Sequence, residues 1–178
     1  MKTSPRGLPL AWAPYLAAGY IGSIILAAAA VQFIGVLPIL PGIMAPAGVY
    51  IVGATMVLRD LLQDAYGPKR TYLFMIIGAL ASALVSPTLA LAAAAAFIIS
   101  ETVDMLVYTP LRKHTLIGAV IASNAVGIIA DTVIFLSIAF GSMDFFTGQI
   151  IGKVFSTIAA VIILSLIYHN RTQLAPTH

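Results

Sequence analysis

The sequence predicts an all-α integral membrane protein, built as a polytopic bundle of six transmembrane helices. Hydrophobic residues make up 61% of the 178 residues and charged residues only 8%, whereas a soluble domain carries about 25% charged residues. One stretch, from Gly7 to Leu58, holds no Asp, Glu, Lys or Arg at all. A helix that crosses a bilayer needs about 20 apolar residues, so this stretch alone is long enough for two.

Proline and glycine divide the apolar stretches into helices. The first stretch breaks at Pro38–Gly42, and the uncharged run from Thr71 to Ser100 breaks at Ser86-Pro87, because these residues interrupt helices. Polar turns at 63–70, 110–114 and 141–144 separate the rest. We expect one transmembrane domain over 1–178, with helices at about 11–36, 43–62, 71–85, 88–109, 116–140 and 145–168.

The basic residues orient this bundle. With the N-terminus in the cytoplasm, the three outer turns contain no Lys or Arg, while all the basic residues except Lys153 fall in cytoplasmic segments or at their helix ends. Cytoplasmic segments of membrane proteins carry such an excess, so both termini are predicted to be cytoplasmic. Joining the third and fourth helices into one span would place Arg112 and Lys113 outside, which disfavours five spans.

Composition also excludes several kinds of site. The chain has no cysteine and only three histidines, all near helix ends or the terminus, so we expect no disulfide, no metal site and no bound cofactor. The net charge of +3 is small and scattered, which argues against a nucleic-acid partner. The lipid bilayer is the expected surrounding, and a homo-oligomer stays open.

Four ionisable residues fall within predicted spans, namely Glu101, Asp104, Asp131 and Lys153. Each costs roughly 2.5–3.5 kcal/mol at a helix centre, so they should face the bundle interior or a watery cavity. With a rise of about 1.5 Å per residue, Asp131 and Lys153 lie roughly 13 Å and 12 Å from the outer ends of their helices. This matching depth predicts a pair, which either is structural or lines a central site.

Two further polar residues share faces with these acids. Tyr108 continues the face that carries Glu101 and Asp104, where the acids either pair with loop cations such as Arg112 and Lys113 or bind substrate donors. Asn124 lies seven residues before Asp131, on the same face of its helix. It is either an interhelical contact or part of the site.

The end of the second helix is also polar, with Arg59, Asp60, Gln63 and Asp64. The two aspartates are an unfavourable like-charged pair at i,i+4, and Arg59 can neutralise one of them. This segment is either a solvated helix end or, together with Tyr108, a source of gating and secondary contacts.

Three more polar or aromatic residues lie within predicted spans. Gln149 is four residues before Lys153 and is expected to orient it. Tyr20 and Tyr50 lie deeper than interfacial aromatic residues, and they either pack in the core or stack on a planar substrate.

Three segments resemble the family of queuosine precursor transporters, also called the vitamin-uptake-transporter-like family. They are Arg59–Arg70 (RDLLQDAYGPKR), Ser100–Arg112 (SETVDMLVYTPLR) and Ser123–Phe135 (SNAVGIIADTVIF), the last followed by Gly152-Lys153. They include the polar residues that are costly in a membrane, and they run in the family's order from the second helix to the sixth. The first helix matches only in character.

The resemblance implies import of 7-cyano-7-deazaguanine, or a related 7-deazapurine, across the bacterial cytoplasmic membrane for tRNA modification. Carboxylates accept the N–H donors of base edges, so Glu101, Asp104 or Asp131 would bind the guanine-like edge. Asn124 would contact the carbonyl edge, and Lys153 would meet an acceptor atom or neutralise Asp131. The sequence is compatible both with proton coupling and with facilitated diffusion.

Other classes of protein compete with this interpretation. The main alternative is the substrate-binding membrane subunit of an energy-coupling-factor vitamin transporter, in which the small residues of the first helix (Ala13, Ala17, Ala18 and Gly22) would dock an ATPase module. An intramembrane enzyme is disfavoured. Asp131 follows Ile129-Ala130, so the Gly-x-Gly-Asp motif of aspartyl proteases is absent. A purely structural subunit would leave the charges within the spans without a purpose.

Overall fold

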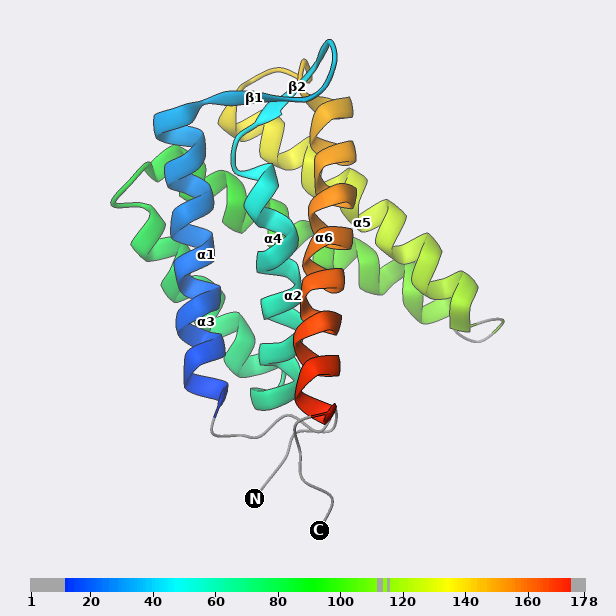
Figure 1. Ribbon diagram of the computed structural model, residues 1–178. Helices are drawn as coiled ribbons and strands as arrows, with labels where there is room; N and C mark the ends of the chain where they lie inside the picture. The colour runs from blue at the N-terminus through cyan, green and yellow to red at the C-terminus, as the bar shows by residue number, and fades with distance from the viewer. Residues whose placement is uncertain (1–11, 112–113, 115, 174–178) are drawn as a thin grey trace.

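The computed structural model describes residues 12–111, 114 and 116–173, and this part of the chain is mostly helical (Figure 1). It contains six helices and one two-stranded antiparallel sheet. In chain order the elements are α1 Ala13–Ile34, β1 Val36–Leu40, β2 Ile43–Pro46, α2 Val49–Tyr66, α3 Pro68–Ser82, α4 Pro87–Leu111, α5 Leu116–Ala139 and α6 Phe146–Gln173.

Each predicted helix is present, but the expected start of the second one is wrong. Residues 43–46, placed in that helix by the sequence, form strand β2, so α2 begins six residues later at Val49. Pro41-Gly42 forms the turn between the strands, and Gly42 has a φ of +78°. Proline followed by a glycine of positive φ suits a tight turn, and Leu40 then pairs with Ile43 across it.

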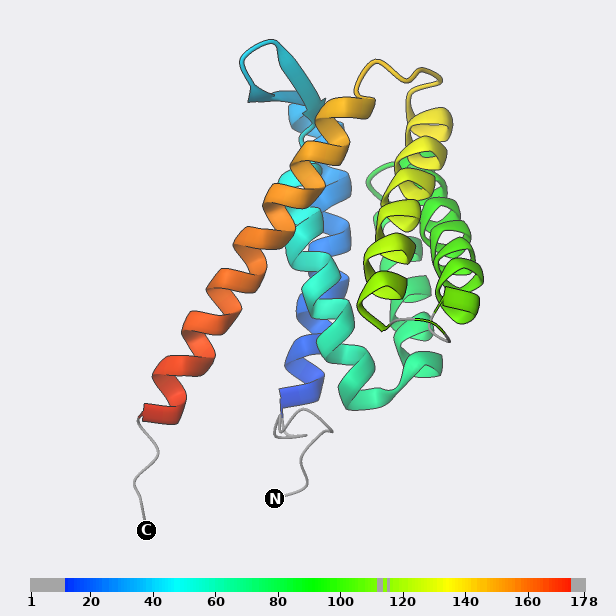
Figure 2. The same ribbon diagram turned by 90° about the vertical axis from the view of Figure 1, so that its right-hand side faces the viewer.

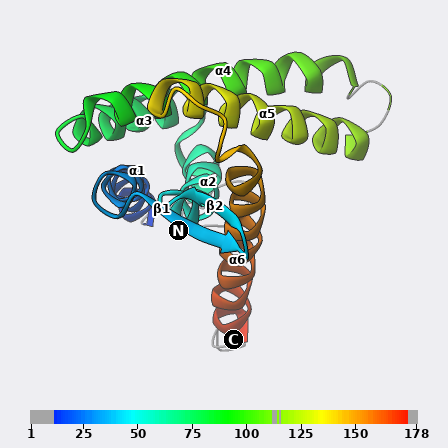
Figure 3. The same cartoon turned by 90° about the horizontal axis from the view of Figure 1, so that it is seen from above.

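The helices form two layers, seen from above in Figure 3 and from the side in Figure 2. Helices α3, α4 and α5 make one layer, in which α4 and α5 pack along each other, while α1, α2 and α6 lie on the other side. The start of α1, the end of α6 and the turn between α2 and α3 lie at one end of the bundle, and the hairpin lies at the opposite end.

Glycines hold α6 close to its neighbours. A Cβ on Gly53 of α2 would lie 2.0 Å from the backbone carbon of Ser156, and one on Gly148 would lie 2.0 Å from the carbonyl oxygen of Met44 in β2. The Gly53 N–H also donates a hydrogen bond to the Ser156 hydroxyl, at 3.1 Å. Small residues allow such close approach of helices in lipid, so α6 is fixed against both α2 and the hairpin.

The exterior of the bundle is strongly apolar. Large side chains point outward, such as Leu84 (91% exposed) and Phe33 (79% exposed), a pattern that marks contact with lipid or a partner rather than water. By length and composition, α1 is the one helix of the described chain that qualifies to cross a membrane. Helices α4 and α5 hold shorter apolar stretches, Pro87–Val103 and Ala125–Ala139. The structure is compatible with an all-α membrane protein that carries one short hairpin.

Candidate functional site

A cavity of about 640 Å³ lies between the two helical layers. Residues from all six helices line it, together with Pro46 at the end of the hairpin. The volume falls within the range of roughly 300–1,000 Å³ that is usual for small-molecule sites. Most of its wall is apolar, and the charged residues among its lining are Arg59, Asp60, Glu101, Asp131 and Lys153.

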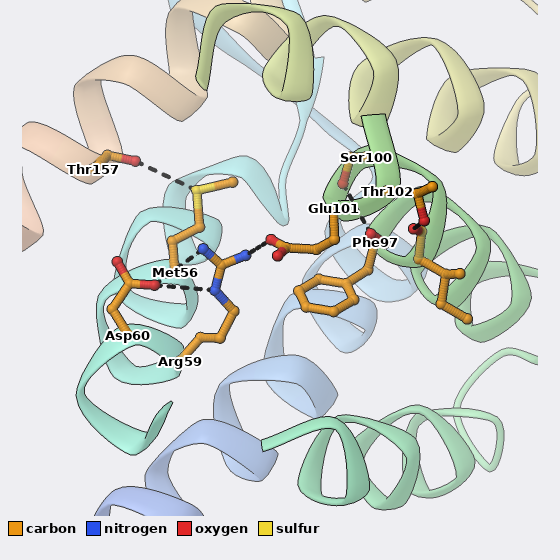
Figure 4. A network of polar contacts seen from close by, with 9 residues as sticks. Met56, Arg59, Asp60, Phe97, Ser100, Glu101, Thr102 and Thr157 are labelled. Atoms are coloured by element: carbon orange, nitrogen blue, oxygen red, sulfur yellow. Dashed lines mark hydrogen bonds and ion pairs between the residues drawn. The ribbon is translucent and has the colours of Figure 1, made fainter. Parts of the chain in front are cut away.

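One charged cluster joins α2 to α4 (Figure 4). The Arg59 guanidinium donates through Nη1 to Oε1 of Glu101, and through Nε and Nη2 to Oδ1 of Asp60, at 3.1 Å and 3.0 Å. Its Cζ atom lies 5.5 Å from the centre of the Phe97 ring, within reach of a cation–π interaction. The planar fork of arginine makes this double contact possible, so Arg59 holds two carboxylates at once.

A second cluster joins α5 to α6. The Lys153 ammonium donates to Oδ2 of Asp131 and, at 2.9 Å, to the hydroxyl of Thr132. Lys153 is 1% exposed, whereas the Asp131 side chain keeps 21% of its surface exposed. The pair expected from matching depth is confirmed. Because the carboxylate is the more accessible partner, it is the one that a molecule in the cavity would meet first.

Both clusters connect one helical layer to the other. Arg59 reaches from α2 to Glu101 on α4, and Lys153 reaches from α6 to Asp131 on α5. The charges therefore stabilise the arrangement of the layers and also line the space between them. A ligand that formed hydrogen bonds with either pair would change the strength of an ion pair that joins the two layers.

The structure brings most of the predicted residues together. Glu101, Asp131 and Lys153, and the secondary residues Arg59, Asp60 and Gln63, all line the cavity. Asp104, Asn124 and Tyr108 lie on α4 and α5, but their side chains are outside the described part of the chain.

One expected pairing rests on residues that the structure does not describe, and a second is wrong. Among the described residues, the cation that pairs with Glu101 is Arg59 from the far layer, while the expected loop partners, Arg112 and Lys113, lie outside the described residues. Gln149 was expected to orient Lys153, and this is wrong. The Gln149 amide oxygen has no hydrogen-bond partner in the described part of the chain, and the Thr132 hydroxyl contacts the ammonium instead.

The two deep tyrosines have separate environments. Tyr20 is 2% exposed and packs with Ala17, Leu62 and Met75, so core packing is confirmed, although it also forms part of the cavity wall. Tyr50 is half exposed and donates its hydroxyl to the Pro38 carbonyl at 2.6 Å. It ties α2 to the hairpin and lines a separate, smaller hollow of about 320 Å³.

Sequence reasoning missed Thr132 and Phe97, and it underestimated Gln149. Thr132 is fully buried, and Gln149 is 4% exposed and lines the cavity. The available signal was position, because Thr132 follows Asp131 and Gln149 precedes Lys153 by one helical turn. In the residues that the structure describes, no group of three or more His, Asp or Glu side chains is placed to hold a metal ion.

A helical bundle with an apolar exterior and a central cavity crossed by ion pairs is compatible with a membrane transporter. Residues 83–170 match the model of the family described as "putative vitamin uptake transporter", which supports the assignment of the chain to this family. The matched segment contains Glu101, Asp104, Asp131 and Lys153, so it covers all four ionisable residues within the predicted spans. No curated protein and no solved structure matches the chain.

Proposed function

We propose that this transporter imports a queuosine precursor, 7-cyano-7-deazaguanine or a related 7-deazapurine, across the bacterial cytoplasmic membrane for tRNA modification. The observation that carries the proposal is a single cavity in which carboxylates and cations from both layers face a space large enough for one base. The description of the matching family names the uptake of vitamins. The residues of the cavity and the resemblance of the sequence support the particular cargo.

The arrangement of the helices supports six spans with both termini in the cytoplasm. The start of α1 and the end of α6 lie at the same end of the bundle as the turn between α2 and α3 (Figure 2). Lys69 and Arg70, both exposed, follow that turn. Basic residues mark the cytoplasmic side of membrane proteins, so this end of the bundle would face the cytoplasm and the hairpin would face outward.

The chemistry of the cavity suits a guanine-like base. Asp131 and Glu101 offer carboxylate oxygens to N–H donors, as acidic side chains do for the exocyclic amine of a base. Lys153 and Arg59 offer donors to a carbonyl or ring nitrogen. Phe97 and Tyr20 supply aromatic surface in the same wall, against which a planar ring can pack. Asp104 and Asn124 belong to the same proposal as further substrate contacts.

The charges are already paired before cargo enters, and this shapes the mechanism. A base that hydrogen-bonds to Asp131 would compete with the Lys153 ammonium for the same carboxylate. Binding would then weaken a contact between α5 and α6, which lie in different layers. Relative movement of the two layers would in turn expose the cavity to one side of the membrane or the other.

The test is uptake in cells that lack both their own importer and the precursor pathway. Labelled 7-cyano-7-deazaguanine should enter, and queuosine should reappear in tRNA, when the wild-type chain is expressed. Asp131→Asn and Glu101→Gln should each reduce uptake by about tenfold or more, the loss of a hydrogen bond to a charged group. Wild-type protein that inserts normally and restores no queuosine would refute this cargo.

A matched control is available in the outer turn. Asp144 is exposed, contacts Ser142 at 3.0 Å and is not part of the cavity. Asp144→Asn changes the same chemical group and should leave uptake at the wild-type level. Equal membrane abundance of all variants, measured by immunoblot, separates a loss of transport from a loss of protein.

The second candidate is the vitamin-binding subunit of an energy-coupling-factor transporter. On α1, Ala13 and Ala17 are buried within the bundle, but Ala18 and Gly22 face outward, and a Cβ on Gly22 would meet nothing within 4 Å. This open small-residue face favours a docked helix from another protein. Copurification of an ATPase module would support this candidate, and uptake without such a module would exclude it.

A further inference from the structure

Gln149 is a buried amide with an unmet acceptor. It lies in the first turn of α6, where its backbone N–H donates to the Phe145 carbonyl at 2.8 Å. The residue is only 4% exposed, and its side-chain oxygen has no hydrogen-bond partner in the described part of the chain. The large majority of buried side-chain polar atoms in proteins are hydrogen-bonded, so this one calls for an explanation.

The backbone around Gln149 is held in place. Gly148, directly before Gln149, packs on the Met44 carbonyl. Gly152 follows Gln149 by three residues, and a Cβ there would lie 2.7 Å from a Val49 methyl group. Both contacts would be lost if α6 rotated or shifted. The amide therefore cannot find a partner through a small movement of its helix.

The nearest cation on the same helix is already engaged. Lys153 lies one turn further along α6, on the same face, and its ammonium donates to Asp131 and Thr132. The cavity that Gln149 lines is thus the place from which a new hydrogen-bond donor can come. The lining of this cavity thus includes the acceptor groups of Asp131 and Gln149 and the donors of Lys153.

We propose that Gln149 is a specificity-determining residue that contacts the cargo through its carboxamide. A carboxamide carries an acceptor and donors in one plane, and a cyclic amide presents an N–H beside a C=O in the same way. The two edges can form a pair of parallel hydrogen bonds. The ligand class is therefore a ring that contains a free lactam edge. This inference rests on the proposed transport function and refines it.

The experiment compares Gln149→Met with wild-type protein purified in detergent. Methionine has nearly the same shape and no amide, so it removes the unmet acceptor from the ligand-free state. The melting temperature of Gln149→Met without ligand should exceed that of the wild type, because an unsatisfied buried acceptor destabilises the fold. The matched control is Thr147→Val, a change at an exposed site of the same helix outside both hollows, which should leave the melting temperature and binding unchanged.

Binding of two bases provides the second readout. For 7-cyano-7-deazaguanine, Gln149→Met should raise Kd by about tenfold, the usual effect of losing a hydrogen bond or two. A derivative methylated on the lactam nitrogen should bind to the wild type more weakly than the parent base does. Gln149→Met should bind the derivative and the parent base with the same Kd. A lower melting temperature in Gln149→Met would overturn the inference, because the amide would then be satisfied within the fold. An unchanged Kd would overturn it too.

A failure of the proposed cargo can be told apart from a failure of this inference. If the wild type binds no deazapurine, a panel of lactam-containing bases and vitamins is tested by the rise in melting temperature that each produces. A lactam compound that stabilises the wild type and not Gln149→Met would support the role of Gln149 with another cargo. No stabilisation by any lactam compound would overturn it.

Discussion

Replacing Asp131 with Asn would leave the Lys153 ammonium in the cavity wall with the Thr132 hydroxyl as its remaining hydrogen-bond partner among the described residues. Removing one member of a buried ion pair costs about 3–5 kcal/mol, since the remaining charge is uncompensated. Lys153 is 1% exposed, so water offsets little of this cost. We expect Asp131→Asn to lower the free energy of unfolding by an amount in that range.

The reverse change should be milder. Lys153→Met leaves a carboxylate that keeps 21% of its side chain exposed to the cavity, where water can solvate it. We expect a cost of about 1–3 kcal/mol, that of a polar group left partly unsatisfied. The asymmetry between the two single variants thus follows directly from the difference in exposure.

The double variant provides the decisive comparison. If the two charges interact, Asp131→Asn with Lys153→Met should cost no more than Lys153→Met alone. The coupling energy is then at least the cost of Asp131→Asn, about 3–5 kcal/mol, which is at or above the top of the usual range of about 0.5–3 kcal/mol. The free energy of unfolding can be measured by denaturant titration in mixed micelles, with Asp144→Asn as the control for an exposed carboxylate. Additive costs in the double variant, or an Asp131→Asn effect no larger than the control, would refute the reasoning.

The same variants separate a structural pair from a substrate site. A pair that only offsets two insertion penalties would give a double variant that regains both stability and uptake. A pair that contacts cargo would give a double variant that regains stability and stays inactive. Uptake normalised to membrane abundance distinguishes the two outcomes.

Two further predictions concern the contacts that join the helices. Arg59→Lys should reduce uptake by about tenfold and lower the melting temperature, because an ammonium lacks the planar fork that holds both carboxylates; wild-type uptake in this variant would show that a single point charge is enough. Gly53→Ala should destabilise the protein by about 1–3 kcal/mol, because the added methyl group meets the Ser156 backbone and forces α2 and α6 apart. The control is Gly22→Ala, where the methyl group meets open space, and equal melting temperatures for the two alanine variants would contradict the close approach of these helices.

The sequence by itself determined the features that depend on local properties. Helix positions follow from apolar runs and from proline and glycine breaks, since the hydrogen bonds of a helix lie within one segment. The pairing of Asp131 with Lys153 could be predicted because the two helices are consecutive and joined by a short turn, so depth along each helix is enough to match them. The resemblance to the family was carried by short polar segments of the sequence, and the model of the family matches residues 83–170.

The hairpin escaped sequence reasoning because its signal is ambiguous. Short apolar runs such as Val36–Leu40 and Ile43–Pro46 suit a strand or the end of a membrane helix equally well. What decides between them is pairing across Pro41-Gly42, together with the contact of Met44 with α6. That contact involves a residue about 100 positions further along the chain, which no local pattern encodes.

Only the tertiary structure decided which partners the remaining polar groups have. Arg59 and Glu101 are 42 residues apart and lie in different layers, and the burial of Gln149 without a partner depends on how α6 is rotated against α2 and the hairpin. A helix specifies which residues share a face, but the direction of that face is set by contacts between helices. Here those contacts are close approaches at glycines, whose geometry depends on the whole bundle.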